Sequence, residues 1–81
     1  MYLDDVKQIL IDILNLGQEG HAMSTQTRLL GSLPQLDSMA VVTVITALEE
    51  HFGITVDDDE ISAATFESLG SLADFVAQKL N

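Results

Sequence analysis

Apolar residues recur at helical spacing in three stretches of the chain. The first runs from Leu3 to about Leu16, with polar residues on the opposite face. The second runs from Ser38 to Phe52, and its apolar positions follow one helix face: Val41, Val44, Ile45, Leu48 and Phe52. The third, near the end of the chain, has the same kind of spacing: Leu69, Leu72, Val76 and Leu80. The pattern predicts three amphipathic helices.

Residues typical of helix ends flank these stretches. Asp37 and Ser38 precede the second run, where a side-chain oxygen can accept a hydrogen bond from an N–H group of the first turn. Ser68 or Ser71 is expected to cap the last helix in the same way. Glycines after the first two runs, Gly17 and Gly53, are expected to end them.

The segments between the helices have no sustained period. Residues 18–35 contain two glycines and the single proline, and we expect a long ordered loop in which three leucines contact the core: Leu29, Leu30 and Leu33. Residues 54–56 are expected to form an extended connector. Residues 57–64, which begin with four acidic residues, are expected to form a short helix. In the first helix Ile11 falls on the side of Asp4 and Lys7 and should be partly exposed.

The predicted fold class is therefore all-α. We expect a small bundle of three main helices plus one short helix, with a long ordered loop between the first and second helices. Nothing in the sequence offers a pairing strand for a sheet. The 81 residues are expected to form one domain, 1–81, that buries roughly 60% of its unfolded surface.

Composition restricts the function further. There is no cysteine, so a thiol must come from a cofactor. The 13 acidic and 3 basic residues give a formal net charge of -10, which disfavours nucleic acid and anionic membranes and favours basic protein surfaces. The first residues lack the positive region of a signal peptide, and no apolar run approaches the roughly 20 residues that span a bilayer. We expect a cytoplasmic monomer that does not insert into membranes.

Ser38 is the strongest candidate for chemistry. At a helix N-terminus its hydroxyl would lie beside N–H groups and the positive end of the helix dipole, which favour an anionic substituent such as a phosphodiester. The plainer interpretation is that Ser38 only caps the helix. A serine hydrolase is disfavoured because the neighbouring residues lack the glycines of a nucleophile elbow and His51 would be roughly 20 Å away along the helix. His21, in the loop, is the one other histidine.

The acidic run at residues 57–60 invites comparison with a calcium-binding EF-hand loop. Counted from Asp57, that pattern lacks an acid or amide at Ile61, the glycine at Ser62 and the closing glutamate at Ser68. A solvated helix start is the better interpretation. His21 and His51 lack ligand spacing with each other, and we predict no metal site.

Several runs together resemble the acyl carrier protein family. They are Leu36-Asp37-Ser38-Met39, the run Ala47-Leu48-Glu49-Glu50-His51-Phe52-Gly53-Ile54, the acidic residues 57–60, and the terminal Ser68-Leu69-Gly70-Ser71-Leu72-Ala73-Asp74-Phe75-Val76. The resemblance covers nearly the whole chain, most specifically Thr27 to Leu80. In that family the serine of an Asp-Ser-Leu or Asp-Ser-Met motif receives 4'-phosphopantetheine from coenzyme A through a phosphopantetheinyl transferase.

The resemblance assigns that role to Ser38, preceded by Asp37, and implies a non-catalytic carrier. Acyl groups, as in fatty acid biosynthesis, would travel as thioesters on the prosthetic arm between acyl-loading and acyl-transfer enzymes. These partners would use basic patches of their own to dock on the second helix. The residues expected to contact them are Met39, Val42, Thr46, Glu49 and Glu50.

Two features differ from the family's usual pattern. Many members have a glycine two positions before the aspartate, whereas here Gly31 is six positions before Asp37. Ala40 and Thr43 stand where acidic residues are frequent, which points away from housekeeping fatty-acid synthesis. The run at residues 31–39 is similar to the stand-alone carriers encoded with bacterial exosortase and exopolysaccharide systems. An aminoacyl or peptidyl carrier, and an unmodified acidic module that only binds a protein, remain as alternatives.

Overall fold

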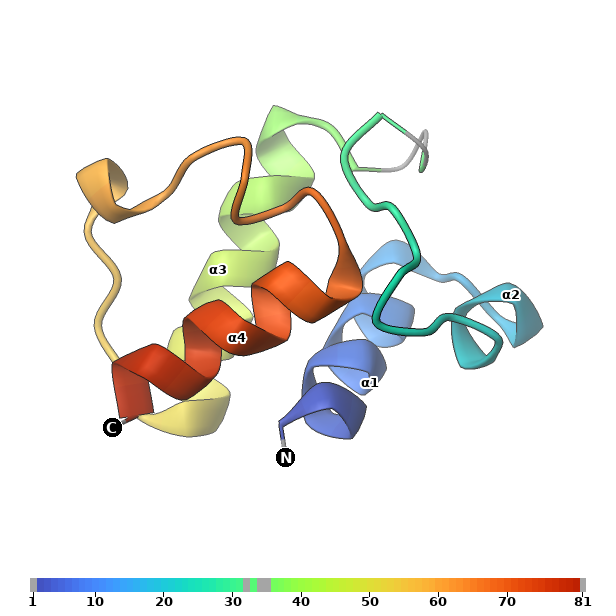
Figure 1. The fold of residues 1–81 in the computed structure, drawn as a ribbon, viewed down its shortest axis with the longest axis horizontal. Helices are drawn as coiled ribbons and strands as arrows, with labels where there is room; N and C mark the ends of the chain where they lie inside the picture. The colour runs from blue at the N-terminus through green and yellow to red at the C-terminus, as the bar shows by residue number, and fades with distance from the viewer. Residues whose placement is uncertain (1, 32, 34–35, 81) are drawn as a thin grey trace.

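The fold is an all-α bundle, as the periodicity predicts. The computed structural model describes residues 2–31, 33 and 36–80. Its main helices are α1 (Leu3–Leu14), α3 (Ser38–Phe52) and α4 (Leu69–Leu80) (Figure 1). The connections contain a short helix, α2 (Gln18–His21), and a 3₁₀ turn, η1 (Asp58–Glu60). Within the described residues, no helix is both long and apolar enough to cross a membrane.

Helix α1 contacts α2, α3 and α4. It ends two residues before the expected Leu16, because Asn15 adopts the left-handed conformation (φ 55°) and donates its N–H to the Ile11 carbonyl. Gly17, the predicted stop, is also left-handed (φ 62°) but lies beyond the helix. A side chain with a short polar group can take this conformation at modest cost, so Asn15 replaces glycine as the helix end.

The prediction that Ile11 is partly exposed was wrong. Ile11 is buried, because α2 folds back over this side of α1. Gly20 of α2 comes so close that a Cβ atom there would overlap the Ile11 side chain. The helical wheel of α1 alone contains no information about a second element that covers its outer side.

The predicted short helix over residues 57–64 was also wrong, since only the η1 turn forms there. The next residues turn instead of continuing the helix: the Ser62 N–H donates to Thr65 Oγ1 (3.3 Å) and the Thr65 N–H to the Ser62 carbonyl (3.0 Å). This turn buries Phe66, which is five residues from the partly buried Ile61. Residues five apart do not share a helix face, so packing both requires the chain to bend.

The loop after α2 is bonded to the segment that leads into α4. The Leu29 and Leu30 N–H groups donate to the Glu67 and Phe66 carbonyls (3.1 and 2.9 Å), and the Leu69 N–H donates back to the Thr27 carbonyl (2.9 Å). Leu29 is buried and Leu33 partly buried, as predicted, whereas Leu30 is 43% exposed. The part of the expected loop that contains Ser32, Pro34 and Gln35 lies outside the described residues.

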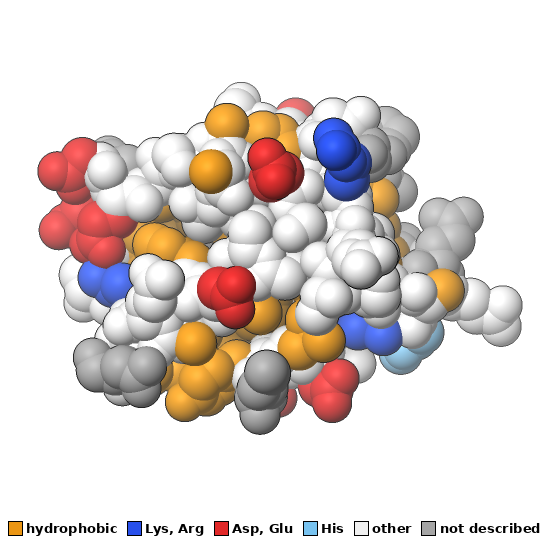
Figure 2. All heavy atoms as spheres, in the orientation of Figure 1, with side chains coloured by type: hydrophobic (Ala, Val, Ile, Leu, Met, Phe, Trp, Pro, Cys, Tyr) orange, Lys and Arg blue, Asp and Glu red, His pale blue; other side chains and the backbone are white. Residues whose placement is uncertain are grey.

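Side-chain contacts hold the remaining connection and the last helix. One of Ser68 and Ser71 was predicted as the cap, and in the structure both take part: each N–H donates to the other's hydroxyl (3.0 and 3.1 Å). The Lys79 ammonium pairs with Glu60 at 2.6 Å, which ties η1 to α4. Figure 2 shows acidic side chains gathered at the edge formed by η1.

The connector at residues 54–56 has its two apolar side chains half-buried and Thr55 exposed, as expected.

Candidate functional site

The N-terminus of α3 is capped by Asp37. Asp37 has an extended backbone, and its Oδ1 accepts a hydrogen bond from the Ala40 N–H at 2.8 Å. Its carbonyl accepts the Val41 N–H at 2.9 Å. Ser38 is therefore the first residue of the helix rather than its cap, and its side chain is exposed. The plain interpretation of Ser38 as a capping residue was wrong.

Ser38 occupies a position that suits a negatively charged group. Its N–H and that of Met39 have no acceptor among the described residues, while Asp37 already occupies the Ala40 N–H. The first turn of α3 contains no acidic side chain. Unpaired N–H groups and the positive end of the helix dipole together stabilise an anion near this hydroxyl.

An apolar cavity of about 390 Å³ opens beside Ser38. Three segments line it: Leu30 from the loop, Ser38 and Val41 from α3, and residues 61–63 with Phe66 from the connection to α4. Apart from the hydroxyls of Ser38 and Ser62, the lining side chains are apolar. The cavity can shelter a hydrocarbon chain attached near Ser38. The sequence prediction did not include this cavity, because its walls lie up to 36 residues apart in the chain.

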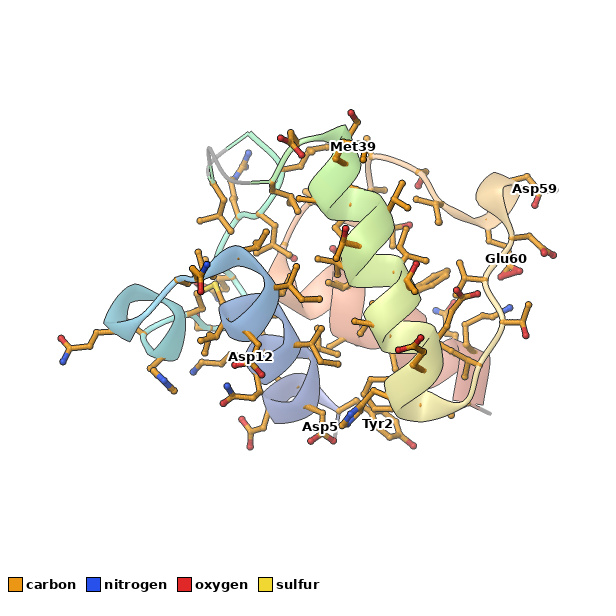
Figure 3. All side chains as sticks on the ribbon, turned by 180° about the vertical axis from the view of Figure 1, so that it is seen from behind. Tyr2, Asp5, Asp12, Met39, Asp59 and Glu60 are labelled. Carbon is orange, nitrogen blue, oxygen red and sulfur yellow. The ribbon has the colours of Figure 1, made fainter. Side chains whose placement is uncertain are left out.

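Four of the five expected partner contacts share one exposed stripe of α3: Met39, Val42, Thr46 and Glu50. Met39 and Val42 are 75% and 61% exposed, and Met39 lies at the N-terminal end of the helix (Figure 3). The fifth, Glu49, is half-buried, and its Oε2 accepts the Val56 N–H at 2.8 Å. Glu49 therefore holds the connector against α3.

The two histidines lie away from Ser38. His51 is in the last turn of α3, with its ring edge-on to Phe52 at a centroid distance of 4.7 Å. His21 is the last residue of α2. Across residues 2–31, 33 and 36–80, no three metal-ligating side chains come together as a site for an ion.

Comparison with known proteins explains this arrangement. The family model described as the phosphopantetheine attachment site matches residues 4–76. The chain belongs to this phosphopantetheine-binding carrier family. A solution NMR structure of a holo acyl carrier protein from Nitrosomonas europaea superimposes with a TM-score of 0.92. It is 61% identical in sequence, and the match covers 99% of this chain and 96% of that one.

As an acyl carrier protein, the chain bears phosphopantetheine and is not itself a catalyst. The groups at the start of α3 fit such a substituent. They include an exposed hydroxyl, two N–H groups without an acceptor among the described residues, and an apolar cavity beside them. The similarity in fold extends through the whole bundle, including the segments that line the cavity.

Proposed function

We propose that Ser38 is the residue that receives 4'-phosphopantetheine and that the protein carries acyl groups. The observation that supports this most strongly is the position of Ser38: it is exposed, first in α3, and released from capping because Asp37 performs that role. The Ser38 Oγ would form the phosphodiester, while the Ser38 and Met39 N–H groups would stabilise the phosphate charge. Asp37 would fix the position of the helix start.

When bound, phosphopantetheine supplies the thiol that this cysteine-free chain lacks. The chain's own contribution is to shelter the cargo. Leu30, Val41, Ile61 and Phe66 provide an apolar surface that excludes water from a hydrocarbon chain. This lining favours an acyl cargo over the aminoacyl or peptidyl alternative, because a charged amino group would lose its hydration in the cavity without gaining a partner.

The proposed partners are a phosphopantetheinyl transferase and the enzymes that load and remove the acyl group. A net charge of -10 attracts partners with basic surfaces and increases the rate of encounter. We further propose that the protein works as a monomer in the cytoplasm. Size-exclusion chromatography with light scattering tests the monomer, and cell fractionation tests the location.

For the pathway, we propose a role beside a bacterial exosortase and exopolysaccharide system instead of housekeeping fatty-acid synthesis. The similarity of the run at residues 31–39 and the absence of acidic residues at Ala40 and Thr43 support this proposal. Deletion of the gene should then reduce exopolysaccharide while leaving growth and bulk fatty acids unchanged. Loss of growth that added fatty acids restore would favour the housekeeping role.

The attachment residue can be tested by intact mass spectrometry. The purified apo protein is incubated with coenzyme A and a broad-specificity phosphopantetheinyl transferase, in parallel with Ser38→Ala and Ser62→Ala. Ser62 is a matched control because it is also exposed and lines the same cavity. We expect one phosphopantetheine mass gain in the wild type and in Ser62→Ala, and none in Ser38→Ala.

Retention of the mass gain in Ser38→Ala would overturn the assignment. No gain in a folded, initially unmodified wild type would instead favour a module that only binds a protein partner. Loading the modified protein with acyl and aminoacyl groups then compares the two carrier alternatives. Relative to the same thioesters on free phosphopantetheine, the proposal expects the protein to slow hydrolysis more for a medium-length acyl group than for an aminoacyl group, because the apolar cavity shelters a hydrocarbon chain.

A further inference from the structure

Residues 61–66, which we call the wall segment, form one side of the cavity beside Ser38 without forming a helix. Residues 61–63 and Phe66 line the cavity, and the chain turns here between η1 and the start of α4. A helix fixes its own side chains through its repeated backbone bonds. The wall segment has no such bonds, so its position depends on hydrogen bonds within its turn and to neighbouring elements.

Thr65 provides the bonds within the turn. It is 9% exposed and is the one polar side chain that is buried among the described residues. Its Oγ1 accepts a hydrogen bond from the Ser62 N–H (3.3 Å), and its N–H donates to the Ser62 carbonyl (3.0 Å). Burying a polar side chain costs free energy that such bonds offset, so they favour one arrangement of the wall segment.

Ser71 holds the wall segment from the side of α4. Its hydroxyl accepts a hydrogen bond from the Ser68 N–H (3.0 Å) and lies 3.0 Å from the Thr65 carbonyl and 2.9 Å from the Ser68 carbonyl. A hydroxyl has one proton, so the two carbonyls share it. Lys79, about two turns further along α4, holds the residue before the wall segment, Glu60. Helix α4 therefore supports this wall at both ends.

The loop that contributes Leu30 to the cavity contains a turn of the same construction. The Ser24 N–H donates to Thr27 Oγ1 (2.8 Å), and the Thr27 N–H donates to the Ser24 carbonyl (3.0 Å). Neither residue lines the cavity. The chain thus offers a matched comparison for the bond between Ser62 and Thr65.

We propose that Thr65 and Ser71 are positioning residues that keep the wall segment closed over a hydrocarbon cargo. This inference rests on the proposed function, since it names the residues that make the shelter effective. A sheltered thioester is hydrolysed when the wall opens locally and admits water. Loss of one hydrogen bond made only in the closed arrangement should increase the open fraction by about fivefold.

The test compares thioesters of two lengths on the modified protein. Octanoyl and acetyl forms are made from the corresponding coenzyme A esters with a broad-specificity phosphopantetheinyl transferase, and hydrolysis is followed by intact mass spectrometry. Each rate is divided by the rate for the same thioester on free phosphopantetheine. An acetyl group is too short to extend along the apolar lining, so the contrast between the two lengths reports shelter and not general stability.

The variants separate the hydroxyl from the rest of the side chain. Thr65→Val resembles threonine in shape but removes the acceptor, whereas Thr65→Ser keeps it. Ser71→Ala removes the bond from α4. Thr27→Val is the control, because it removes the same kind of bond from the turn that does not line the cavity. Circular dichroism verifies that each variant is folded.

We expect Thr65→Val and Ser71→Ala each to speed octanoyl hydrolysis by about fivefold and acetyl hydrolysis by less than about twofold. Thr65→Ser should protect the octanoyl group nearly as well as the wild type. Thr27→Val should lower the Tm, because a hydrogen bond is lost, but it should leave octanoyl hydrolysis unchanged.

Full octanoyl protection in Thr65→Val, or an equal loss of protection in Thr27→Val, would overturn the inference. If Thr65→Val does not fold, Ser71→Ala decides in the same way, with Ser71→Thr as the variant that keeps the hydroxyl. If the wild type gains no phosphopantetheine mass, or does not slow octanoyl hydrolysis at all, the proposed function itself fails. The two failures are thereby distinguished.

Discussion

The Asp37 carboxylate accepts a hydrogen bond from the Ala40 N–H at 2.8 Å, so Asp37, and not Ser38, caps α3. Replacing Asp37 by Ala should lower the free energy of unfolding by about 1 kcal/mol, whereas Ser38→Ala should change it by less than about 0.5 kcal/mol. In a domain of this size 1 kcal/mol corresponds to a fall in Tm of about 4–8 °C. Thermal and urea unfolding, followed by circular dichroism, measure the Tm and the free energy of unfolding of both variants.

Asp37→Asn is the matched control for this pair, because an asparagine side chain caps nearly as well as aspartate. It should retain most of the wild-type stability. If Ser38→Ala proved as destabilising as Asp37→Ala, the Ser38 hydroxyl would have to be engaged in capping. The separation of capping from modification described above would then be incorrect.

The contact between Glu60 and Lys79 makes stability depend on pH. The hydrogen bond from the Lys79 ammonium, helped by the Asp57 N–H, holds the pKa of Glu60 below its ordinary value of 4.5. The folded state therefore binds this proton more weakly than the unfolded state does. The stabilisation is present above pH 4.5 and is lost as the pH falls through the lowered pKa of the folded protein.

Urea midpoints of the wild type and Glu60→Gln should consequently differ at pH 7 and converge in acid. Asp59→Asn, an exposed change in the same acidic run, controls for the loss of one negative charge. A difference between wild type and Glu60→Gln that stayed constant from pH 7 to pH 3 would argue against this ion pair as its source.

Gly70, in the first turn of α4, lies against the loop. A Cβ atom at this position would lie 2.8 Å from the Thr25 carbonyl oxygen and 3.1 Å from Thr25 Cβ. An exposed helical Gly→Ala substitution usually stabilises by about 1 kcal/mol. Here we expect a loss of about 1–3 kcal/mol, because the backbone of the loop has to move away.

Urea unfolding measures the change in stability, and amide exchange at Gly70 reports whether its hydrogen bond to the Thr25 carbonyl, 3.0 Å in length, weakens. Asp74→Ala places an alanine at an exposed position of the same helix and should be nearly neutral. A gain in stability for Gly70→Ala would show that the loop moves away from α4 at little cost in free energy.

The features that the sequence could predict are those encoded locally. Helical periodicity located α1, α3 and α4, because Val44, Leu48 and Leu72 are buried by the helix face on which they lie. The serine caps of α4 followed from the short polar side chains at residues 68 and 71. Ser38 stood out for the same reason, since the residues that mark the start of a helix are its immediate neighbours.

The features that the sequence could not predict depend on contacts between distant segments. Ile11 is buried by α2, and Leu30, which lines the cavity beside Ser38, is 43% exposed. Glu49 was expected on the docking surface. Its carboxylate instead accepts a hydrogen bond from the Val56 N–H in the next segment. A helical wheel shows to which side of the helix a side chain points. It does not show which other segment packs against that side.

Two walls of the cavity beside Ser38 are joined through the backbone. The Leu30 N–H donates to the Phe66 carbonyl at 2.9 Å, and neighbouring bonds on either side extend this connection from Thr25 to Gly70. Leu30 and Phe66 therefore form one hydrogen-bonded wall of the cavity. A cargo attached at Ser38 would lie against a surface that the backbone, and not side-chain packing alone, keeps in place.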